Sequence, residues 1–250
     1  MTLFDKQKSH ILLILSTAVA LGIGLIVTAI SLTNYHRVKA HMIHEFSRQM
    51  SSQSSLAADY INHHVNLKSW ALSTLIKDSS FVELVRTNNL KAVQKQLTEF
   101  ASQDDYLENL FICSPGYQGK IGAQILTDAI GNVSKGVVFG IDDPFSHTLA
   151  QSLDKKISHS SIGQSPVTGK TVILITAPII DNGSVIAIIG YATLLGDILD
   201  HLIASIKIGT QGYLFFATPG GMAVAHPNKK FNWNLDINTL GFWEQIAGAK

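Results

Sequence analysis

The chain has 250 residues and an almost balanced charge, with 19 Lys and Arg residues against 18 Asp and Glu residues. Its length allows one large or two small domains with a substantial core. The balanced charge gives no sign of a clustered basic face, so we predict no nucleic-acid partner. The single cysteine, Cys113, excludes an intrachain disulfide scaffold, and its place in the apolar run LFICS predicts a buried hydrophobic residue.

Residues 11–32 form an apolar run without a charge. As a helix this run would be about 33 Å long, enough to cross a hydrocarbon core of about 30 Å. It is longer than the core of a signal peptide, which has about 7–15 apolar residues. We therefore predict an uncleaved transmembrane helix over residues 11–32 after a cytoplasmic leader over residues 1–10. Basic residues flank the run equally on both sides, so charge alone leaves its orientation open.

Three small residues of this run, Ala20, Gly24 and Thr28, recur at a spacing of four. Small residues on one face of a helix let two helices approach closely in lipid. They predict a dimer face, although Gly and Ala are also common in membrane helices without such a role.

The ninety residues from 25 to 114 contain neither Gly nor Pro, which indicates helix. We predict a long stalk helix over residues 33–78, with an apolar stripe that packs against a globular body near Trp70. A second helix is predicted over residues 89–103, where four apolar residues share a face. The intervening stretch, KDSSFVELVRTNN, is interpreted as a connection with Ser80 as a helix cap.

After Asp105 the pattern changes to short strands separated by turn residues. LENLFICS and GAQILTDAIG are interpreted as strands, and the apolar, β-branched runs TVILITAPII and SVIAIIGYAT as two more. Asn-Gly between the last two runs predicts a hairpin, and Asp181 at mid-depth makes a second membrane span costly. A helix over residues 194–206 and a further hairpin, GYLFFATPGGMAVAHP, follow. The sequence therefore predicts an α+β fold with two similar modules in tandem.

The order of three stretches resembles the extracytoplasmic double-Cache sensor, a family with two PAS-like modules on one long helix. These stretches are SPVTGKTVILITAPIIDNGSVIAIIGY, LLGDILDHLIASIKIGTQGYLF and GGMAVAHP. The resemblance implies a membrane-distal ligand-binding module over residues 79–206 and an incomplete membrane-proximal module over residues 207–250. It also implies a single-pass protein of the bacterial inner (cytoplasmic) membrane, with the sensor on the periplasmic or extracellular side.

In this family the ligand pocket lies among loops that correspond to residues 129–165. The Arg, Trp and Tyr cluster with which some members hold amino acids is missing here. Ser165 and Ala192 stand near positions where those members carry carboxylates, so recognition of amino acids by that set is not expected. We expect a small-molecule ligand of unknown identity to contact five residues: Asp143, Phe145, His147, Ser165 and Tyr191.

The chain lacks the sequence patterns of common catalytic and metal sites. No nucleophile elbow, zinc-protease, P-loop or dinucleotide motif occurs. Asp143, Ser146 and His147 are too close in sequence to form a triad, whose members converge from separate elements. Pairs such as His63 and His64 lack the three or four converging ligands of a zinc site, so we predict solvated stalk histidines. We expect no catalytic residue, no metal and no cofactor.

The sequence therefore predicts the input region of a bacterial transmembrane receptor, anchored in the lipid bilayer and dimeric through its transmembrane and stalk helices. The resemblance favours a chemoreceptor and leaves a diguanylate cyclase or histidine kinase as further output classes. The alternative is a membrane-anchored dimerisation or interaction module without a small-molecule ligand. An exported enzyme is disfavoured because no catalytic constellation was found.

Overall fold

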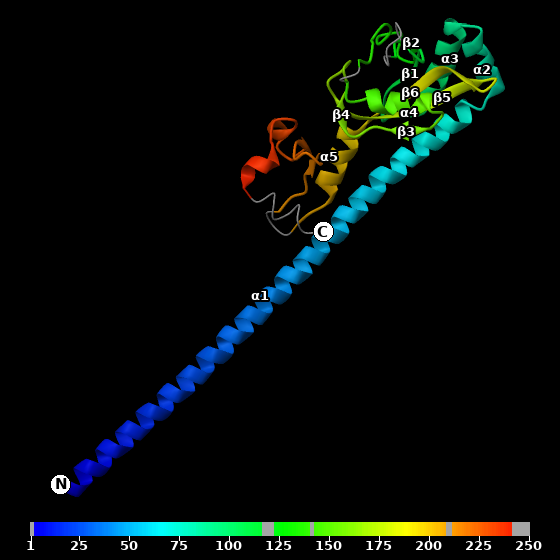
Figure 1. The fold of residues 1–250 in the computed structure, drawn as a ribbon. Helices are drawn as coiled ribbons and strands as arrows, with labels where there is room; N and C mark the ends of the chain where they lie inside the picture. The colour runs from blue at the N-terminus through cyan, green and yellow to red at the C-terminus, as the bar shows by residue number, and fades with distance from the viewer. Residues whose placement is uncertain (1–2, 117–122, 141–142, 209–211, 242–250) are drawn as a thin grey trace. The chain divides into compact units, whose positions relative to one another are not determined.

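A computed structural model describes residues 3–116, 123–140, 143–208 and 212–241, with side chains from residue 15 onward. The chain divides into two units, residues 1–56 and residues 57–250, which we describe separately. Figure 1 shows the order of the helices and strands.

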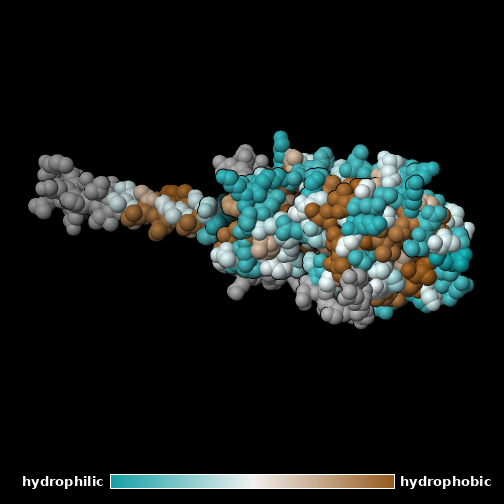
Figure 2. All heavy atoms as spheres, turned by 90° about the horizontal axis from the view of Figure 1, so that it is seen from above, coloured by the Kyte–Doolittle hydropathy of each residue, from teal (hydrophilic) through white to brown (hydrophobic). Residues whose placement is uncertain are grey.

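The described residues of the first unit, 3–56, are all helical and form the N-terminal part of α1 (Leu3–Leu75). This helix contains an apolar stretch long enough to cross a membrane, and none of that stretch is buried within the protein. Its large apolar side chains, including Leu15, Leu25 and Ile26, are exposed, and Figure 2 shows hydrophobic atoms along the outside of the helix. Lipid is the environment that such a surface favours.

The second unit is built on an antiparallel sheet. Its strands are β1 (Leu107–Cys113), β2 (Ile125–Asp128), β3 (Ser158–His159), β4 (Gly163–Gln164), β5 (Thr171–Asp181) and β6 (Ser184–Leu194). Their order across the sheet is β2-β1-β6-β5-β3, and β4 also pairs with β5. The four strands predicted in this region are therefore confirmed, and the long β5 and β6 lie at the centre.

The central hairpin has a two-residue turn. Asp181 pairs with Ser184, and between them Asn182 and Gly183 have φ angles of 46° and 79°. Two successive residues with positive φ define a type I′ turn, whose twist matches that of the strands, and Asn-Gly is the pair that best tolerates it. The predicted hairpin is thus confirmed.

The two faces of the sheet are covered by different elements. One face packs against α2 (Ser79–Arg86), α3 (Leu90–Ala101), α5 (Leu195–Ser205) and the C-terminal part of α1. The other face packs against α4 (Ser146–Leu153) and the loops beside β2. Because side chains alternate along a strand, Ile189 and Tyr191 face the first layer, whereas Ile188 and Ala192 face the second.

The C-terminal part of α1 contacts the sheet unit through a narrow row of residues. Ala57, Val65 and Leu72 are buried there. The body does bury this part of the helix, as predicted, but Trp70 itself is 70% exposed, and Tyr60 and Leu67 are also exposed. The predicted stripe was too wide because apolar residues lie on two faces of the helix and only one face meets the sheet.

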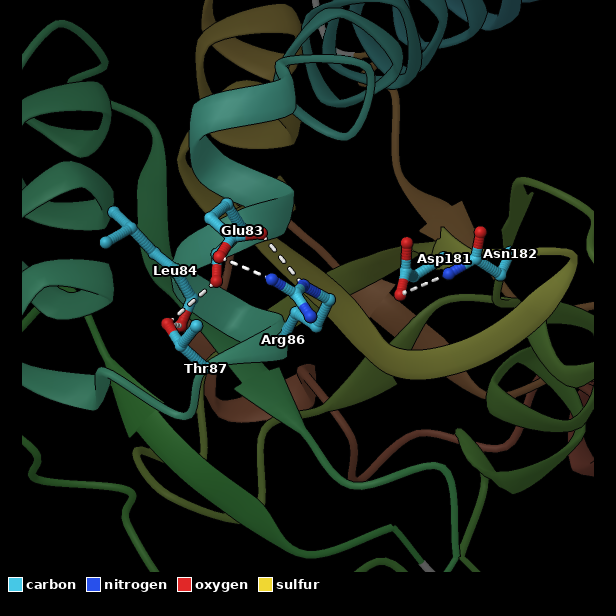
Figure 3. Close-up of polar contacts among 6 residues, drawn as sticks. All are labelled: Glu83, Leu84, Arg86, Thr87, Asp181 and Asn182. Atoms are coloured by element: carbon cyan, nitrogen blue, oxygen red, sulfur yellow. Dashed lines mark hydrogen bonds and ion pairs between the residues drawn. The ribbon is translucent and has the colours of Figure 1, made fainter.

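The predicted connection after α1 was partly wrong, because residues Ser79–Arg86 form the helix α2. Its N-cap is Asp78 rather than Ser80: the Asp78 carboxylate accepts hydrogen bonds from Ser80 N at 2.8 Å and from Phe81 N at 3.4 Å. Figure 3 shows the other end of α2, where Arg86 donates two hydrogen bonds to Glu83 near Asp181 and Asn182 of the hairpin turn. This exposed pair contributes little stability, and α2 is held mainly by the fully buried Phe81.

The C-terminal segment contains β7 (Phe216–Ala217), β8 (Ala223–Ala225) and the 3-10 helices η1 (Lys229–Phe231) and η2 (Ile237–Leu240). The predicted hairpin is present but shorter than expected. His226 directly follows β8, as predicted, and is buried. Trp233 Nε1 donates to Thr171 Oγ1 of β5 at 2.8 Å, which ties this segment to the main sheet.

Candidate functional site

A small cavity lies on the α4 side of the sheet, in the region where the sequence predicts a ligand. Its volume is about 20 Å³, which is room for roughly one water molecule. The walls come from β1, β2, β5, β6 and the loops around α4, and are mainly apolar. The lining residues are Glu108, Asn109, Phe111, Ile125, Phe139, Phe145, Ser165, Pro166, Val167, Val172, Leu174 and Ala192.

Aromatic rings fill most of the space above the sheet here. The rings of Phe111 and Phe139 stack with centroids 5.8 Å apart. Two glycines make room for neighbouring rings: a Cβ at Gly190 would lie 2.3 Å from Phe111 Cζ, and a Cβ at Gly163 would lie 3.0 Å from Phe145 Cζ. The cavity is therefore small because the rings occupy it, and any organic ligand larger than a few atoms requires a ring to move.

One polar group in the wall has a fixed orientation. The fully buried carboxylate of Asp128 accepts the Ser134 hydroxyl proton at 2.6 Å, so the Ser134 oxygen must in turn accept from the Asn109 amide at 2.7 Å. This chain of donors places the NH₂ group of Asn109 toward Ser134. Asn109 Oδ1 is buried and has no hydrogen-bond partner among the described residues, so it is an acceptor available to a ligand or a water.

Two of the predicted site residues line the cavity. The ring of Phe145 is buried, and Ser165 Oγ accepts from the backbone of Val167 at 3.1 Å and of Thr168 at 3.3 Å. These contacts leave the Ser165 hydroxyl proton free to donate, since both use the oxygen as an acceptor.

Asp143 and His147 lie nearby without lining the cavity. Asp143 Oδ1 accepts from the backbone N of Phe145 at 2.8 Å, and so fixes the turn that positions that ring. His147 is exposed on α4, with its Nε2 atom 3.0 Å from Gln151 Nε2. Asp143 therefore affects the cavity only through the position of Phe145, and His147 lies at the surface.

Tyr191 lies on the opposite face of the sheet from the other four residues. It is 1% exposed and packs against the layer that contains α1 and α3. The sequence located its strand correctly, but alternation alone does not tell which face of a buried strand meets which layer. Tyr191 lines a different hollow, between α1 and α3.

Asn109 and Glu108 were not identified from the sequence, although both line the cavity. The sequence LENLFICS could have indicated them, because Glu108 and Asn109 are two polar residues in a strand that is otherwise apolar. A buried polar residue needs a partner, so its presence in a core strand marks a position for closer attention. Cys113, at the other end of β1, is fully buried, as predicted, and burial raises the pKa of its thiol. Within the described ranges, no three His, Cys, Asp or Glu side chains come together as metal ligands.

Burial raises the pKa of the Asp143 carboxyl above its ordinary value of 3.8, and the hydrogen bond from Phe145 N opposes that shift. A raised pKa means that folding disfavours the charged form, so stability is lost as the pH rises through the folded-state pKa. We expect Asp143→Asn, which keeps an acceptor for Phe145 N, to raise the melting temperature at pH 7. The gain should disappear below pH 3.8, where wild-type Asp143 is protonated in both states. Thermal unfolding followed from pH 3 to pH 8 measures this, and an equal gain at every pH would contradict it.

Comparisons with known proteins give matches among solved structures. No family model and no curated protein matches the chain. The extracellular domain of vpHK1S-Z8, a protein assigned as a histidine kinase, matches with a TM-score of 0.62 at 11% identity, over 84% of this chain and 82% of that one. The sensor domain of the V. cholerae histidine kinase DctB matches with a TM-score of 0.59 at 12% identity, over 79% and 74% of the two chains.

A third match is the ligand-binding domain of the Campylobacter jejuni chemoreceptor Tlp3, solved in complex with 4-methylisoleucine. Its TM-score is 0.52 at 14% identity, over 81% of this chain and 78% of that one. At these identities the likeness concerns the fold. The chain has the Cache/PAS-like fold of the sensor domains of chemoreceptors, histidine kinases and GGDEF proteins, and the predicted resemblance is confirmed.

Proposed function

We propose that the chain is the extracytoplasmic input region of a bacterial transmembrane signal receptor, of the chemoreceptor type, and that it binds a small molecule in the distal module, residues 79–206. The observation that carries the proposal is the cavity on the α4 face of the sheet, with the buried Asn109 carbonyl oxygen and the Ser165 hydroxyl in its walls. Solved sensor domains with the same fold include one that holds 4-methylisoleucine. The apolar surface of the first unit supports a single membrane anchor over residues 11–32.

A ligand in this cavity would act by displacing aromatic rings. Phe145 is the ring that we expect to move, because it lines the cavity and its neighbour Gly163 has no side chain to hold it. A molecule that binds better to the open arrangement shifts the population toward it. The shift would pass to a dimer formed through Ala20, Gly24 and Thr28 of the transmembrane helix and through the stalk over residues 33–78. Thr28 supports close helix packing, since its hydroxyl donates to Gly24 O at 2.8 Å within its own helix and needs no other partner.

A panel of organic acids, amines, nucleobases and sugars tests the ligand proposal on the full chain in detergent micelles. We expect at least one class of compound to raise the melting temperature in a saturable manner, because a ligand that binds only the folded state stabilises it. Ala192→Val adds two methyl groups inside the cavity wall and should abolish the shift. Ala204→Val, the same change at an exposed position of α5, is the matched control and should leave the shift unchanged. The absence of any shift across the panel would contradict ligand sensing.

A second candidate function is favoured by one observation, namely that the rings leave room for only about one water. A module filled with side chains would serve as a membrane-anchored dimerisation or interaction domain without a small-molecule ligand. The same panel separates the two candidates. Stable dimers without any thermal shift would support the interaction module, whereas a shift that Ala192→Val removes supports the sensor.

A further inference from the structure

A second and larger hollow lies on the other face of the sheet, between α1 and the end of α3. Its volume is about 310 Å³, within the range of small-molecule sites. We call it the α1–α3 groove. Its walls come from three elements that are distant in sequence: Ala71 and Trp70 on α1, Phe100 on α3, and Tyr191 on β6. The sheet separates this groove from the α4-side cavity, because Tyr191 and Ala192 point to opposite faces.

The groove contains a buried donor without an acceptor. The Tyr191 hydroxyl is buried and has no hydrogen-bond partner among the described residues. An unpaired hydroxyl in a protein interior costs free energy that a water or a ligand atom would recover. The hydroxyl can donate, so it indicates an acceptor on the molecule that fills the groove.

The charged groups of the groove also leave donors in excess. Lys68 Nζ pairs with Asp104 Oδ2 at 2.5 Å and lies 5.9 Å from the centroid of the Tyr191 ring. Asp104 Oδ1 is also occupied, since it accepts from Tyr106 N at 3.0 Å. Asp104 Oδ2 is buried and meets Lys68 as an ion pair, with no hydrogen-bond partner among the described residues. An ammonium group has three protons and one carboxylate oxygen cannot use them all, so Lys68 retains donors.

His64, four residues before Lys68 on α1, adds no positive charge beside the groove. His64 Nε2 lies 3.0 Å from Thr193 Oγ1, and its ring packs edge-on against Tyr106. Burial is the largest cause that lowers the pKa of His64, and Lys68 lowers it further, so the imidazole is neutral at pH 7. The prediction of a solvated stalk histidine is therefore wrong for His64, which is half-buried against β6.

Apolar side chains surround the two donors of the groove, the Tyr191 hydroxyl and the Lys68 ammonium group. Trp70 is 70% exposed at the rim, and Phe100 and Ala71 form the sides. Aromatic faces of this kind favour stacking with a planar ring.

We propose that the α1–α3 groove is a second ligand site, for a small aromatic carboxylate. The carboxylate would accept from the Tyr191 hydroxyl and from Lys68, as charge-assisted hydrogen bonds require, and the ring would lie between Trp70 and Phe100. Lys68 and Asp104 together carry no net charge. A carboxylate ligand would add one negative charge next to the Lys68 ammonium group, which still has protons to donate. The inference does not rest on the α4-side cavity.

Benzoate is the probe, and benzylammonium, which has the same ring and the opposite charge, is its matched control. Both are titrated by calorimetry into the full chain in detergent micelles at pH 7. We expect saturable binding of benzoate and none of benzylammonium. Equal binding of the two compounds, or no binding of benzoate, would overturn the inference.

Two variants locate the binding. Tyr191→Phe removes only the hydroxyl, so we expect benzoate to bind about tenfold more weakly, as the loss of a hydrogen bond to a charged group predicts. The free variant should melt at the same temperature as the wild type or higher, because it loses an unpaired buried donor. Ala192→Val, on the other face, should leave benzoate binding unchanged. Benzoate binding that Ala192→Val abolishes and Tyr191→Phe preserves would overturn the groove site and support the α4-side cavity instead.

Discussion

Replacement of Asp128 by alanine is expected to lower the free energy of unfolding by about 3–5 kcal/mol, because several buried hydrogen bonds to one carboxylate are lost together. The carboxylate is fully buried and accepts four hydrogen bonds, from the backbone N atoms of Ile130, Asn132 and Ser134 and from the Ser134 hydroxyl. Alanine leaves all four donors without this acceptor, and buried unpaired donors carry a large penalty. The loop after β2 would lose its shape, and Asn109 would lose the hydroxyl that orients it.

Chemical denaturation of the full chain, followed by circular dichroism, measures this loss. Asp105→Ala is the control, because Asp105 is exposed on the loop before β1, and we expect a change within about 0.5 kcal/mol. A loss below about 1 kcal/mol for Asp128→Ala would show that other groups hold the loop, since that is the size of one ordinary hydrogen bond. Ligand binding in the α4-side cavity should weaken in parallel, since Asn109 forms part of its wall.

The second large effect is expected at Gly190, in the middle of β6. A methyl group there would lie 2.3 Å from Phe111 Cζ, far inside van der Waals contact. Phe111 is buried and stacked on Phe139, so its ring cannot swing aside into solvent. We expect Gly190→Ala to cost about 3 kcal/mol, at the upper end of overpacking effects in well-packed cores.

A double-mutant cycle tests the cause of this loss. Phe111→Leu should relieve the clash, so the double variant Gly190→Ala, Phe111→Leu should be more stable than the sum of the single changes predicts. Gly196→Ala is the matched control, because a Cβ at Gly196 meets its nearest neighbour, Thr171 Cβ, at an ordinary 3.5 Å. Strict additivity of the two changes at residues 190 and 111 would show that the ring is not the obstacle.

The strands and most helices of the second unit could be predicted because local sequence determines them. Asn182 and Gly183 specify the turn of the central hairpin, and the continuous apolar runs on either side specify two buried strands. The helix α3 was predicted from its apolar spacing, and its buried residues are Val93 and Leu97. In each case the signal lies within about a dozen consecutive residues.

The short helix α2 was missed for a related reason. Its four large apolar side chains, Phe81, Val82, Leu84 and Val85, stand at helical spacing, but the segment is only eight residues long and its cap Asp78 was overlooked beside two serines. The turn at residues 76–77 that ends α1 is equally local, but no Gly or Pro marks it. Tertiary burial of Phe81, which the sequence does not display, selects the helix there.

The candidate site was predicted less completely, because it depends on distant pairings. Phe145 and Ser165 were placed correctly in the wall, whereas Asn109 enters the wall only because β1 pairs with β6, where it lies opposite Ala192. Tyr191 was assigned to the ligand region, but its side chain faces α1. Both faces of β6 are apolar, so the sequence does not show which side chains point to which layer. The narrowness of the cavity follows from Phe111 lying over Gly190, a contact between residues 79 positions apart.

The strand β6 ends at Leu194 and the helix α5 begins at Leu195, so no linker separates them. A hinge needs loop residues that can absorb a change in φ and ψ, and no loop residue lies between β6 and α5. A shift or tilt of β6 would therefore also move α5. The buried side of α5 packs in one cluster with Val224 of β8, so the small C-terminal sheet would move as well. We therefore expect β6 and α5 to move together as one rigid element.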